Sequence, residues 1–246
     1  MKKILLVSGC SFTNANYKSI QHPEREFLWN KWPKILAEKL NMDCINLAQS
    51  GTGNEFISSS IIDQIEAMDK SSIGLVIPAW SQCRRRDYQA TSIRSNREVW
   101  RSEMFDTLGD IEYWIKKSFR IYYSFQIYCE YFKIPYKQIQ MIELHKDNVD
   151  EENSKIKYYE YDEKNIDWKK LHEKRKKYDE YAKSLIYYKN FKNFVGETTP
   201  IQSLQDILTD NRKNKQTLKW FNISSIDAHP SEYGHNLIAE YIYENL

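Results

Sequence analysis

The sequence has no long hydrophobic run, which argues against a membrane-spanning helix. Such a helix needs ~20 consecutive apolar residues, whereas the apolar stretch at residues 4–7 ends at once in Ser8-Gly9-Cys10. The stretch is also shorter than the ~7–15 apolar residues of a signal peptide. Its end resembles a bacterial lipoprotein cleavage box with Cys10 as the lipid-bearing residue, but its length argues against that interpretation. We therefore expect a cytoplasmic protein.

Paired cysteines and an excess of charge are also lacking. The four cysteines lie far apart and form no C-x-x-C pair, which indicates neither a zinc site nor a disulfide framework. The net charge is +2, from 36 basic and 34 acidic residues, so no global field favours nucleic acid or an anionic membrane. His22, His145 and His172 show no metal-ligand spacing. We expect no metal, no cofactor, no nucleic acid and no membrane partner.

The first 80 residues alternate between short apolar runs and segments whose apolar residues have helical spacing. Apolar runs at 4–7, 43–47 and 73–79 predict buried strands, and stripes with helical spacing predict helices over 32–40 and 57–68. Short parallel strands joined by helices are typical of a right-handed, doubly wound sheet. Ligands of such sheets bind beyond the carboxyl ends of the strands.

The remainder of the chain extends this pattern. We predict a helix over 111–132, a fourth strand over 134–143, a helix over 201–208, a last strand or extended segment over 221–226 and a closing helix from 233. Residues 145–200 are dense in charge, and 166–194 predict a long charged helix. We expect one α/β domain over 1–246, of flavodoxin-like three-layer α/β/α type with a parallel sheet of about five strands. The segment 145–200 would be a charged helical insertion, either a solvated face or a lid or homo-oligomer contact.

Glycine is scarce as well, and its placement is informative. Four of the seven glycines, Gly9, Gly51, Gly53 and Gly234, lie at predicted strand ends or in the C-terminal motif. Ordinary turns explain part of that placement, and close backbone approaches explain the rest.

Residues that suit nucleophilic catalysis lie at the same edge of the predicted sheet. Ser11 follows the first strand, and Asp227 and His229 follow the last predicted segment. Pro230 disfavours helical backbone angles at His229, so its ring can project from a loop. A nucleophile, a general base and a group that orients the base are what a serine hydrolase needs.

Three short blocks resemble the SGNH (GDSL-type) hydrolase family. They are Gly9-Cys10-Ser11-Phe12, then Asn46 with Gly51 in "NLAQSG", then Asp227, His229 and Pro230 followed by "SEYGH". The same pattern resembles SGNH-type proteins of phages, and the Lys-, Asn-, Ile- and Tyr-rich composition suits an AT-rich genome, so we consider a phage origin. The resemblance covers about the first 80 and the last 20 residues.

The resemblance implies roles for individual residues. Ser11 would attack a carbonyl, His229 would take its proton and Asp227 would orient the imidazole. The backbone N–H groups of Ser11 and Gly51 would face the oxyanion, and losing such a donor costs roughly 2.7–4 kcal/mol.

The chain departs from the family in three places. Cys10 replaces the usual Asp, and a buried thiol is the simpler interpretation of it than a second nucleophile. Asp227 lies two positions before His229, where the family more often has three. The third block, Gly-x-Asn-Asp, is missing after the third strand. Asn54 is our candidate for its amide, with helix capping as the alternative, and Ser81 and Gln82 are rivals.

Residues after the third strand are the candidates for substrate binding. We name Trp80, Ser81 and Arg84, and the run 84–86 could hold an anion or be solvated. His235 is expected to pack or cap within the last helix.

The predicted function is hydrolysis of an ester through a Ser11 acyl-enzyme, on a small molecule or a glycan, with an O-acetylated glycan favoured. A binding protein without activity and an O-acyltransferase that uses the same residues are the alternatives.

Overall fold

The core of the protein is a parallel sheet of four strands. The computed structural model describes residues 2–91, 98–104, 110–145, 168–209 and 220–246. The strands are β1 (Ile4–Gly9), β2 (Asp43–Asn46), β3 (Ile73–Trp80) and β6 (Ile139–Gln140), in the order β2-β1-β3-β6. All three pairings are parallel, with Gly9 opposite Ala79 at the carboxyl edge. The predicted α/β class is confirmed.

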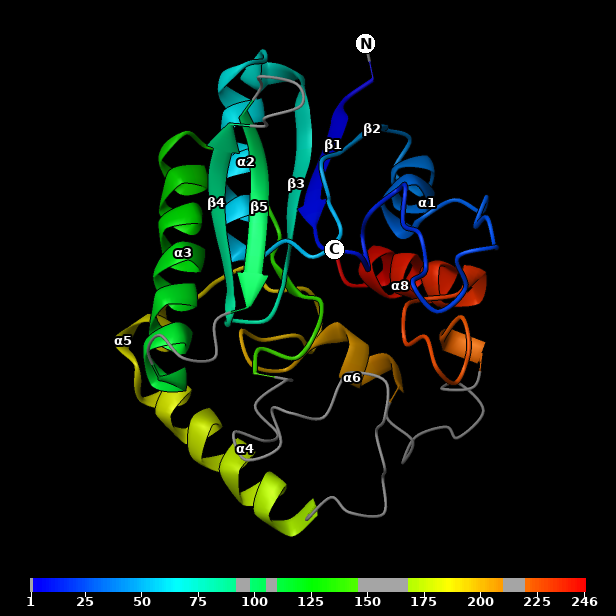
Figure 1. The fold of residues 1–246 in the computed structure, drawn as a ribbon. Helices are drawn as coiled ribbons and strands as arrows, with labels where there is room; N and C mark the ends of the chain where they lie inside the picture. The colour runs from blue at the N-terminus through cyan, green and yellow to red at the C-terminus, as the bar shows by residue number, and fades with distance from the viewer. Residues whose placement is uncertain (1, 92–97, 105–109, 146–167, 210–219) are drawn as a thin grey trace.

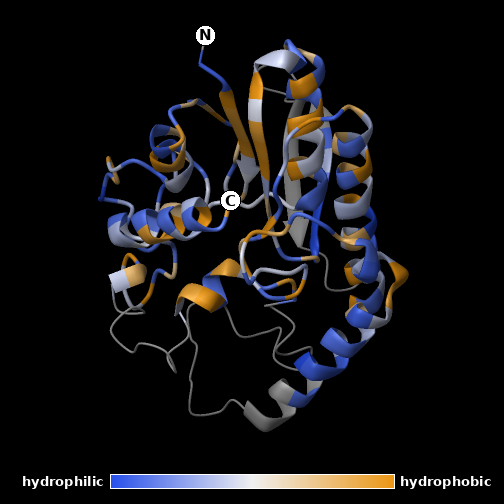
Figure 2. Cartoon of the chain, turned by 180° about the vertical axis from the view of Figure 1, so that it is seen from behind, coloured by the Kyte–Doolittle hydropathy of each residue, from blue (hydrophilic) through white to orange (hydrophobic). Residues whose placement is uncertain are grey.

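Successive residues of a strand point to opposite faces of the sheet. Since both faces of β1 and β3 are apolar and buried, helices cover the sheet on both sides. Leu6 and Val76 pack with α2 (Asn54–Glu66) and α3 (Ile111–Tyr131). Leu5, Val7 and Ile77 pack with α1 (Trp32–Lys39) and α8 (Glu232–Glu244). Figure 1 shows the two helix layers on either side of β1 and β3, and Figure 2 shows that these strands are largely hydrophobic.

The last two predicted strands differ from expectation. Within the predicted segment 134–143, regular pairing is limited to the two residues of β6. Two isolated bridges add to it, from Tyr136 to Val76 and from Gln138 to Phe194. For 221–226 we predicted a last strand or an extended segment, and the strand is wrong, since Asn222 forms only an isolated bridge to Pro230. Tight turns close this segment on itself, so its backbone bonds are satisfied without a sheet partner.

An antiparallel hairpin follows β3 where we expected only a loop. It consists of β4 (Arg85–Thr91) and β5 (Glu98–Met104). The Asp87 carboxylate accepts hydrogen bonds from Gly53 N and Phe56 N, each 2.8 Å, and so caps the start of α2. A Cβ on Gly53 would lie 2.6 Å from Arg85 Cβ, so this glycine is needed for the close approach of the hairpin.

The described part of the segment 145–200 is mainly helical. The helix predicted over 166–194 is divided into α4 (Trp168–Ser184) and α5 (Ile186–Asn190), because Leu185 is extended. Residues 146–167 of this segment lie outside the described residues. The largely hydrophilic α4 extends away from the sheet (Figure 2). A short helix, α6 (Leu204–Thr209), follows close to its predicted position.

The assignment of 145–200 as an insertion in one domain stays a prediction. Every helix in the described ranges is too short or too polar to cross a membrane.

Candidate active site

Ser11 lies on a tight turn directly after β1. The Cys10 carbonyl accepts hydrogen bonds from Thr13 N at 2.9 Å and Asn14 N at 3.1 Å, which reverses the chain. A Cβ at position 9 would lie 2.5 Å from Thr13 Oγ1, so the turn requires Gly9. The Cys10 side chain is fully buried in the core. The turn therefore buries Cys10 and leaves Ser11 partly exposed at the edge of the sheet.

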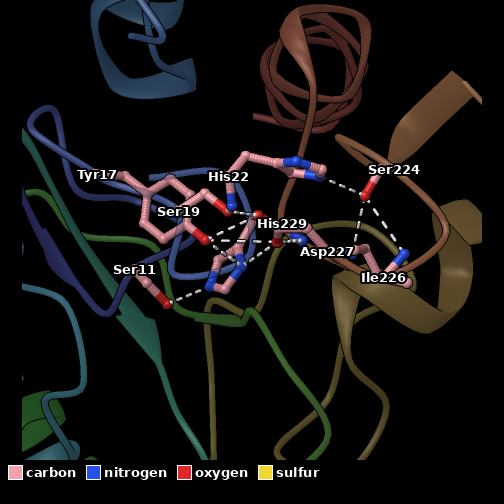
Figure 3. A network of polar contacts seen from close by, with 8 residues as sticks. All are labelled: Ser11, Tyr17, Ser19, His22, Ser224, Ile226, Asp227 and His229. Atoms are coloured by element: carbon pink, nitrogen blue, oxygen red, sulfur yellow. Dashed lines mark hydrogen bonds and ion pairs between the residues drawn. The ribbon is translucent and has the colours of Figure 1, made fainter. Parts of the chain in front are cut away.

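Ser11, His229 and Asp227 form a continuous chain of hydrogen bonds (Figure 3). Ser11 Oγ lies 2.8 Å from His229 Nε2, and His229 Nδ1 lies 2.7 Å from Asp227 Oδ1. The backbone N–H of His229 also donates to Asp227 Oδ1, at 3.1 Å. The two-residue spacing between Asp227 and His229 is therefore compatible with an orienting contact. With its proton on Nδ1, His229 presents the lone pair of Nε2 to Ser11.

Tyr17 and Ser19 hold the carboxylate from the opposite side. Ser19 Oγ donates to Asp227 Oδ2, and Tyr17 Oη donates to the same oxygen at 3.1 Å. Tyr17 Oη also lies 2.8 Å from His229 Nδ1, and the two rings stack with their centroids 4.2 Å apart. Phe12 packs on the imidazole with a centroid distance of 5.0 Å. These contacts restrict the imidazole to one orientation.

Electrostatics keep Asp227 ionised although its side chain is almost fully buried. Burial raises the pKa of Asp227, but hydrogen bonds from His229 and Ser19 lower it more, so the pKa lies well below the usual value. Burial and the charge of Asp227 raise the pKa of Tyr17, which stays a neutral donor. Near neutral pH the site therefore combines a carboxylate with a protonated phenol.

The loop that carries Asp227 and His229 is fixed by its own hydrogen bonds. Ser224 Oγ accepts from Asp227 N at 3.1 Å, and Ile223 N donates to the His229 carbonyl at 2.8 Å. His22 Nε2 lies 2.8 Å from Ser224 Oγ, which ties the loop to the segment that carries Tyr17 and Ser19 (Figure 3). This loop therefore holds His229 in place without belonging to a strand.

The loop after β2 lies against the turn of Ser11. Asn46 Nδ2 donates to the Thr13 carbonyl at 2.7 Å, and Thr52 Oγ1 donates to the Gly9 carbonyl at 3.2 Å. Gly51 has a φ of +84°, in the left-handed region that favours glycine. Among the described residues, neither Ser11 N nor Gly51 N has a hydrogen-bond acceptor. Both amides are therefore available as donors.

Known structures share this arrangement of strands and helices. One is assigned to the G-D-S-L family of lipolytic proteins, from Desulfitobacterium hafniense DCB-2; it is 14% identical, with 100% of both chains covered and a TM-score of 0.50. The chain has an SGNH (GDSL-type) hydrolase fold. The psychrotrophic esterase EstA of Pseudoalteromonas sp. is 12% identical, with 99% of this chain and 96% of that chain covered and a TM-score of 0.47. No protein-family model and no curated protein matches the sequence.

Asn54 does not fit the predicted role of oxyanion donor in this SGNH-type fold. Its Nδ2 donates to the Ser81 carbonyl and to Ser118 Oγ, both at 3.2 Å, and its Oδ1 accepts from Ser81 N at 2.8 Å. Both amide hydrogens are thus already used within the core. Helix capping is not its role either, because Gly53 is the N-cap and Asn54 is the first residue of α2. Asn54 instead joins α2 to the end of β3 and to α3.

Two of the candidate substrate-binding residues belong to the core. Trp80 is fully buried, stacks on Tyr122 at 4.3 Å and donates from Nε1 to Gln138. Ser81 is also fully buried, and its Oγ has no hydrogen-bond partner among the described residues. Neither side chain can contact substrate in this conformation, so these two predictions are corrected. The third candidate, Arg84, is partly exposed at the start of the hairpin.

Gln82 is the remaining side-chain amide at this edge. It is 5% exposed, its Oε1 has no hydrogen-bond partner, and its side chain makes no hydrogen bond within the described part of the chain. Because Gly9 pairs with Ala79, Gln82 follows the strand next to β1, at the carboxyl edge of the sheet. Gln82 is therefore a buried residue at this edge with an unused side-chain amide.

Sequence reasoning missed Tyr17 and Ser19. They lie in a segment from 10 to 31 that has no helix or strand, and nothing in its residue pattern connects it to Asp227. Its length was the available signal, because long irregular loops in compact domains are commonly functional. In the ranges that the structure describes, no cluster of three His, Cys, Asp or Glu residues could hold a metal ion.

Proposed function

We propose that this protein is a serine hydrolase that cleaves an ester through an acyl-enzyme on Ser11. The observation that carries the proposal is the chain of contacts from Ser11 Oγ to His229 Nε2, 2.8 Å, and from His229 Nδ1 to Asp227 Oδ1, 2.7 Å. These are hydrogen-bonding distances for a nucleophile, its general base and the group that orients the base. The SGNH-type fold, shared with a protein assigned to a lipolytic family, supports an acyl substrate.

In the proposed reaction, Ser11 Oγ attacks the ester carbonyl carbon while its proton passes to His229 Nε2. The tetrahedral intermediate collapses, the alcohol leaves with the proton from His229, and the acyl group remains on Ser11. Water then attacks the acyl-enzyme, gives a proton to His229 and releases the acid, after which the proton returns to Ser11 Oγ. Asp227 stays ionised throughout and stabilises the imidazolium.

We assign the oxyanion donors to the backbone N–H groups of Ser11 and Gly51 and to the side-chain amide of Gln82. The two backbone groups have no competing acceptor among the described residues, and Gln82 replaces Asn54, whose amide is occupied. Gln82→Ala is expected to lower kcat about 10²–10³-fold if its amide reaches the oxyanion. Gln82→Glu, which keeps the shape but removes the donors, is the matched control and should be as slow.

Labelling with a fluorophosphonate tests the assignment of the nucleophile. The wild-type protein should become labelled at Ser11, as mapped by mass spectrometry, and Ser11→Ala should not react. Hydrolysis of p-nitrophenyl esters should fall to background in the same variant. Equal labelling or equal rates for the two proteins would refute the role of Ser11. Absence of labelling in the wild-type protein would favour a binding protein without activity.

The acyl group and the acceptor are finer proposals. We keep an O-acetyl group on a glycan as the favoured substrate, and a series of p-nitrophenyl esters from acetate to longer chains tests the preference for a short acyl group. Acyl transfer is the second candidate, because the same acyl-enzyme can react with an alcohol instead of water. Product analysis with an added sugar acceptor separates transfer from hydrolysis.

A further inference from the structure

A cavity lies beside the candidate active site and is lined largely by the loop that carries Tyr17. Its volume is about 630 Å³, in the range of pockets that hold small organic ligands. Tyr17, Phe27 and Trp29 form an aromatic wall, with ring centroids 6.3 Å apart for the first pair and 4.9 Å for the second. The cavity shares Tyr17 with the active site, so its contents would lie one side chain away from His229.

The cavity is lined by four basic residues and a single acidic one. The acidic residue is Glu26. Two of the basic residues form ion pairs with glutamates that do not line the cavity. Arg25 Nε lies 3.5 Å from Glu24, and Lys34 Nζ lies 3.6 Å from Glu38. The other two, Lys18 and Lys31, form no ion pair within the described residues. The wall of the cavity therefore carries unbalanced positive charge.

Lys31 is the most unusual of these residues because it is only 4% exposed. Its Nζ donates one hydrogen bond, to the Phe27 carbonyl at 3.0 Å, and lies 4.7 Å from the centroid of the Trp29 ring. An ammonium group has three donors, and a buried charge without a counter-ion is costly. Burial lowers the pKa of Lys31 to about 8, which reflects the same cost.

The start of α1 adds to this positive charge. Lys31 is the N-cap residue, it provides no side-chain cap, and the first turn contains no acidic residue. A helix N-terminus favours negative charge and disfavours a cation, so Lys31 and Lys34 occupy unfavourable positions. Trp29 Nε1, in the same wall, is also buried without a hydrogen-bond partner among the described residues. The chain thus concentrates donors here, and Glu26 is the one acidic residue among the described residues of the lining.

We propose that this cavity is a binding site for a small organic anion, with its carboxylate or phosphate on Lys31 and its apolar body against Phe27 and Trp29. The anionic group offsets the charge of Lys31 and of the helix N-terminus. The aromatic wall accounts for a ring or other apolar portion. The site does not depend on the assignment of Ser11 as a nucleophile, because none of the residues that bind the anion takes part in the proposed reaction.

The test is calorimetric titration of benzoate and of inorganic phosphate into the full chain. It is run on Ser11→Ala as well as on wild type, so that binding is measured apart from turnover. We expect both proteins to bind benzoate more tightly than phosphate, and Lys31→Met to lose at least tenfold in affinity for both. Lys34→Met, in the same helical turn but exposed and paired with Glu38, should stay within about twofold to threefold.

Thermal unfolding separates a ligand-binding role of Lys31 from a structural one. If Lys31 binds a ligand, Lys31→Met without anion should unfold at the wild-type temperature or above it, because an uncompensated buried charge is removed. Benzoate should then raise the melting temperature of the wild-type protein and leave that of Lys31→Met unchanged. A lower melting temperature for the variant with no change in anion affinity would overturn the proposal, as would absence of binding to the wild-type protein.

Steady-state kinetics identify the source of the anion. If benzoate raises KM for an ester and leaves kcat unchanged, the cavity accepts an anionic part of the substrate itself. If benzoate binds but changes kcat, or changes neither constant, the cavity accepts a separate anion. Either result supports the site, and only equal affinity in wild type and Lys31→Met, or no binding, refutes it.

Discussion

Replacing Asp227 by asparagine tests the proposed mechanism at the residue whose spacing from His229 departs from the family pattern. The carboxylate accepts hydrogen bonds from four donors: Ser19 Oγ, Tyr17 Oη, His229 N and His229 Nδ1. Asparagine has the same shape but offers one oxygen and one NH₂ group. One orientation sets the NH₂ against the hydroxyls of Tyr17 and Ser19, and the other sets it against His229 Nδ1.

The second orientation explains the expected loss of activity. An amide that donates to His229 Nδ1 moves the imidazole proton to Nε2, and His229 then cannot accept the proton of Ser11. Such a change of tautomer costs about 10⁴ in kcat in serine proteases, which corresponds to about 5.5 kcal/mol. Since the first orientation retains the productive tautomer, we expect Asp227→Asn to lose about 10³–10⁴ in kcat/KM.

Ser19→Ala is the matched control, because it removes one donor and keeps the carboxylate. A hydrogen bond to a charged group contributes about 1.5–3 kcal/mol, equivalent to roughly one to two pKa units. The pKa of Asp227 begins well below its usual value, so the carboxylate of the variant stays ionised at neutral pH. We expect activity within about tenfold of wild type at pH 7.

The measurement is hydrolysis of a p-nitrophenyl ester over a range of pH, with circular dichroism to verify folding. The role of Asp227 would be refuted if Asp227→Asn keeps its fold and hydrolyses the ester within tenfold of the wild-type rate while Ser11→Ala is inactive.

The remaining predictions concern stability. Burial lowers the pKa of His235 to about 3 in the folded protein. In the unfolded chain this imidazole binds a proton near pH 6.5, so the free energy of unfolding falls as the pH drops below 6.5. The loss between pH 7 and pH 5 is about 2 kcal/mol. Urea unfolding at both pH values should show this loss in wild type and a smaller one in His235→Gln. Gly9→Ala places a Cβ 2.5 Å from Thr13 Oγ1 and should cost about 1–3 kcal/mol; an unchanged urea midpoint would contradict the close approach. Asp87→Ala leaves two N–H groups at the start of α2 without acceptors and should cost about 2 kcal/mol or more, whereas Asp87→Asn should lose less.

Much of the fold could be predicted because burial leaves a local pattern. The apolar runs of β1 and β3 are buried on both faces, so they appear as continuous hydrophobic stretches. The apolar stripe of α2 has helical spacing because only one side of the helix faces the sheet. The hairpin of β4 and β5 could not be recognised in this way, because its first strand begins with charged residues that indicate a loop.

The candidate site could be predicted only in part. Ser11 follows from its position directly after β1, at the carboxyl edge of the sheet. His229 was placed at that edge by a predicted strand that the structure lacks, and a turn-rich loop brings it to Ser11 instead. Tyr17 and Ser19 could not be assigned to Asp227, since their contacts with it span more than 200 positions and leave no periodicity. Asn54 was misassigned because an amide at a helix start looks the same whether it faces substrate or the core.

The sequence alone therefore determined the fold class, the parallel strands β1, β2 and β3 and the edge at which Ser11 lies. These features depend on hydrophobic periodicity and on glycine at a tight turn, which are local properties of the chain. Only the tertiary structure decided which polar groups have partners: that Asp227 is held by Tyr17 and Ser19, that the amide of Asn54 is occupied, and that Lys31 has no counter-ion. Hydrogen bonds and ion pairs act over a few ångströms between residues distant in sequence, so their partners are known only once the chain is folded.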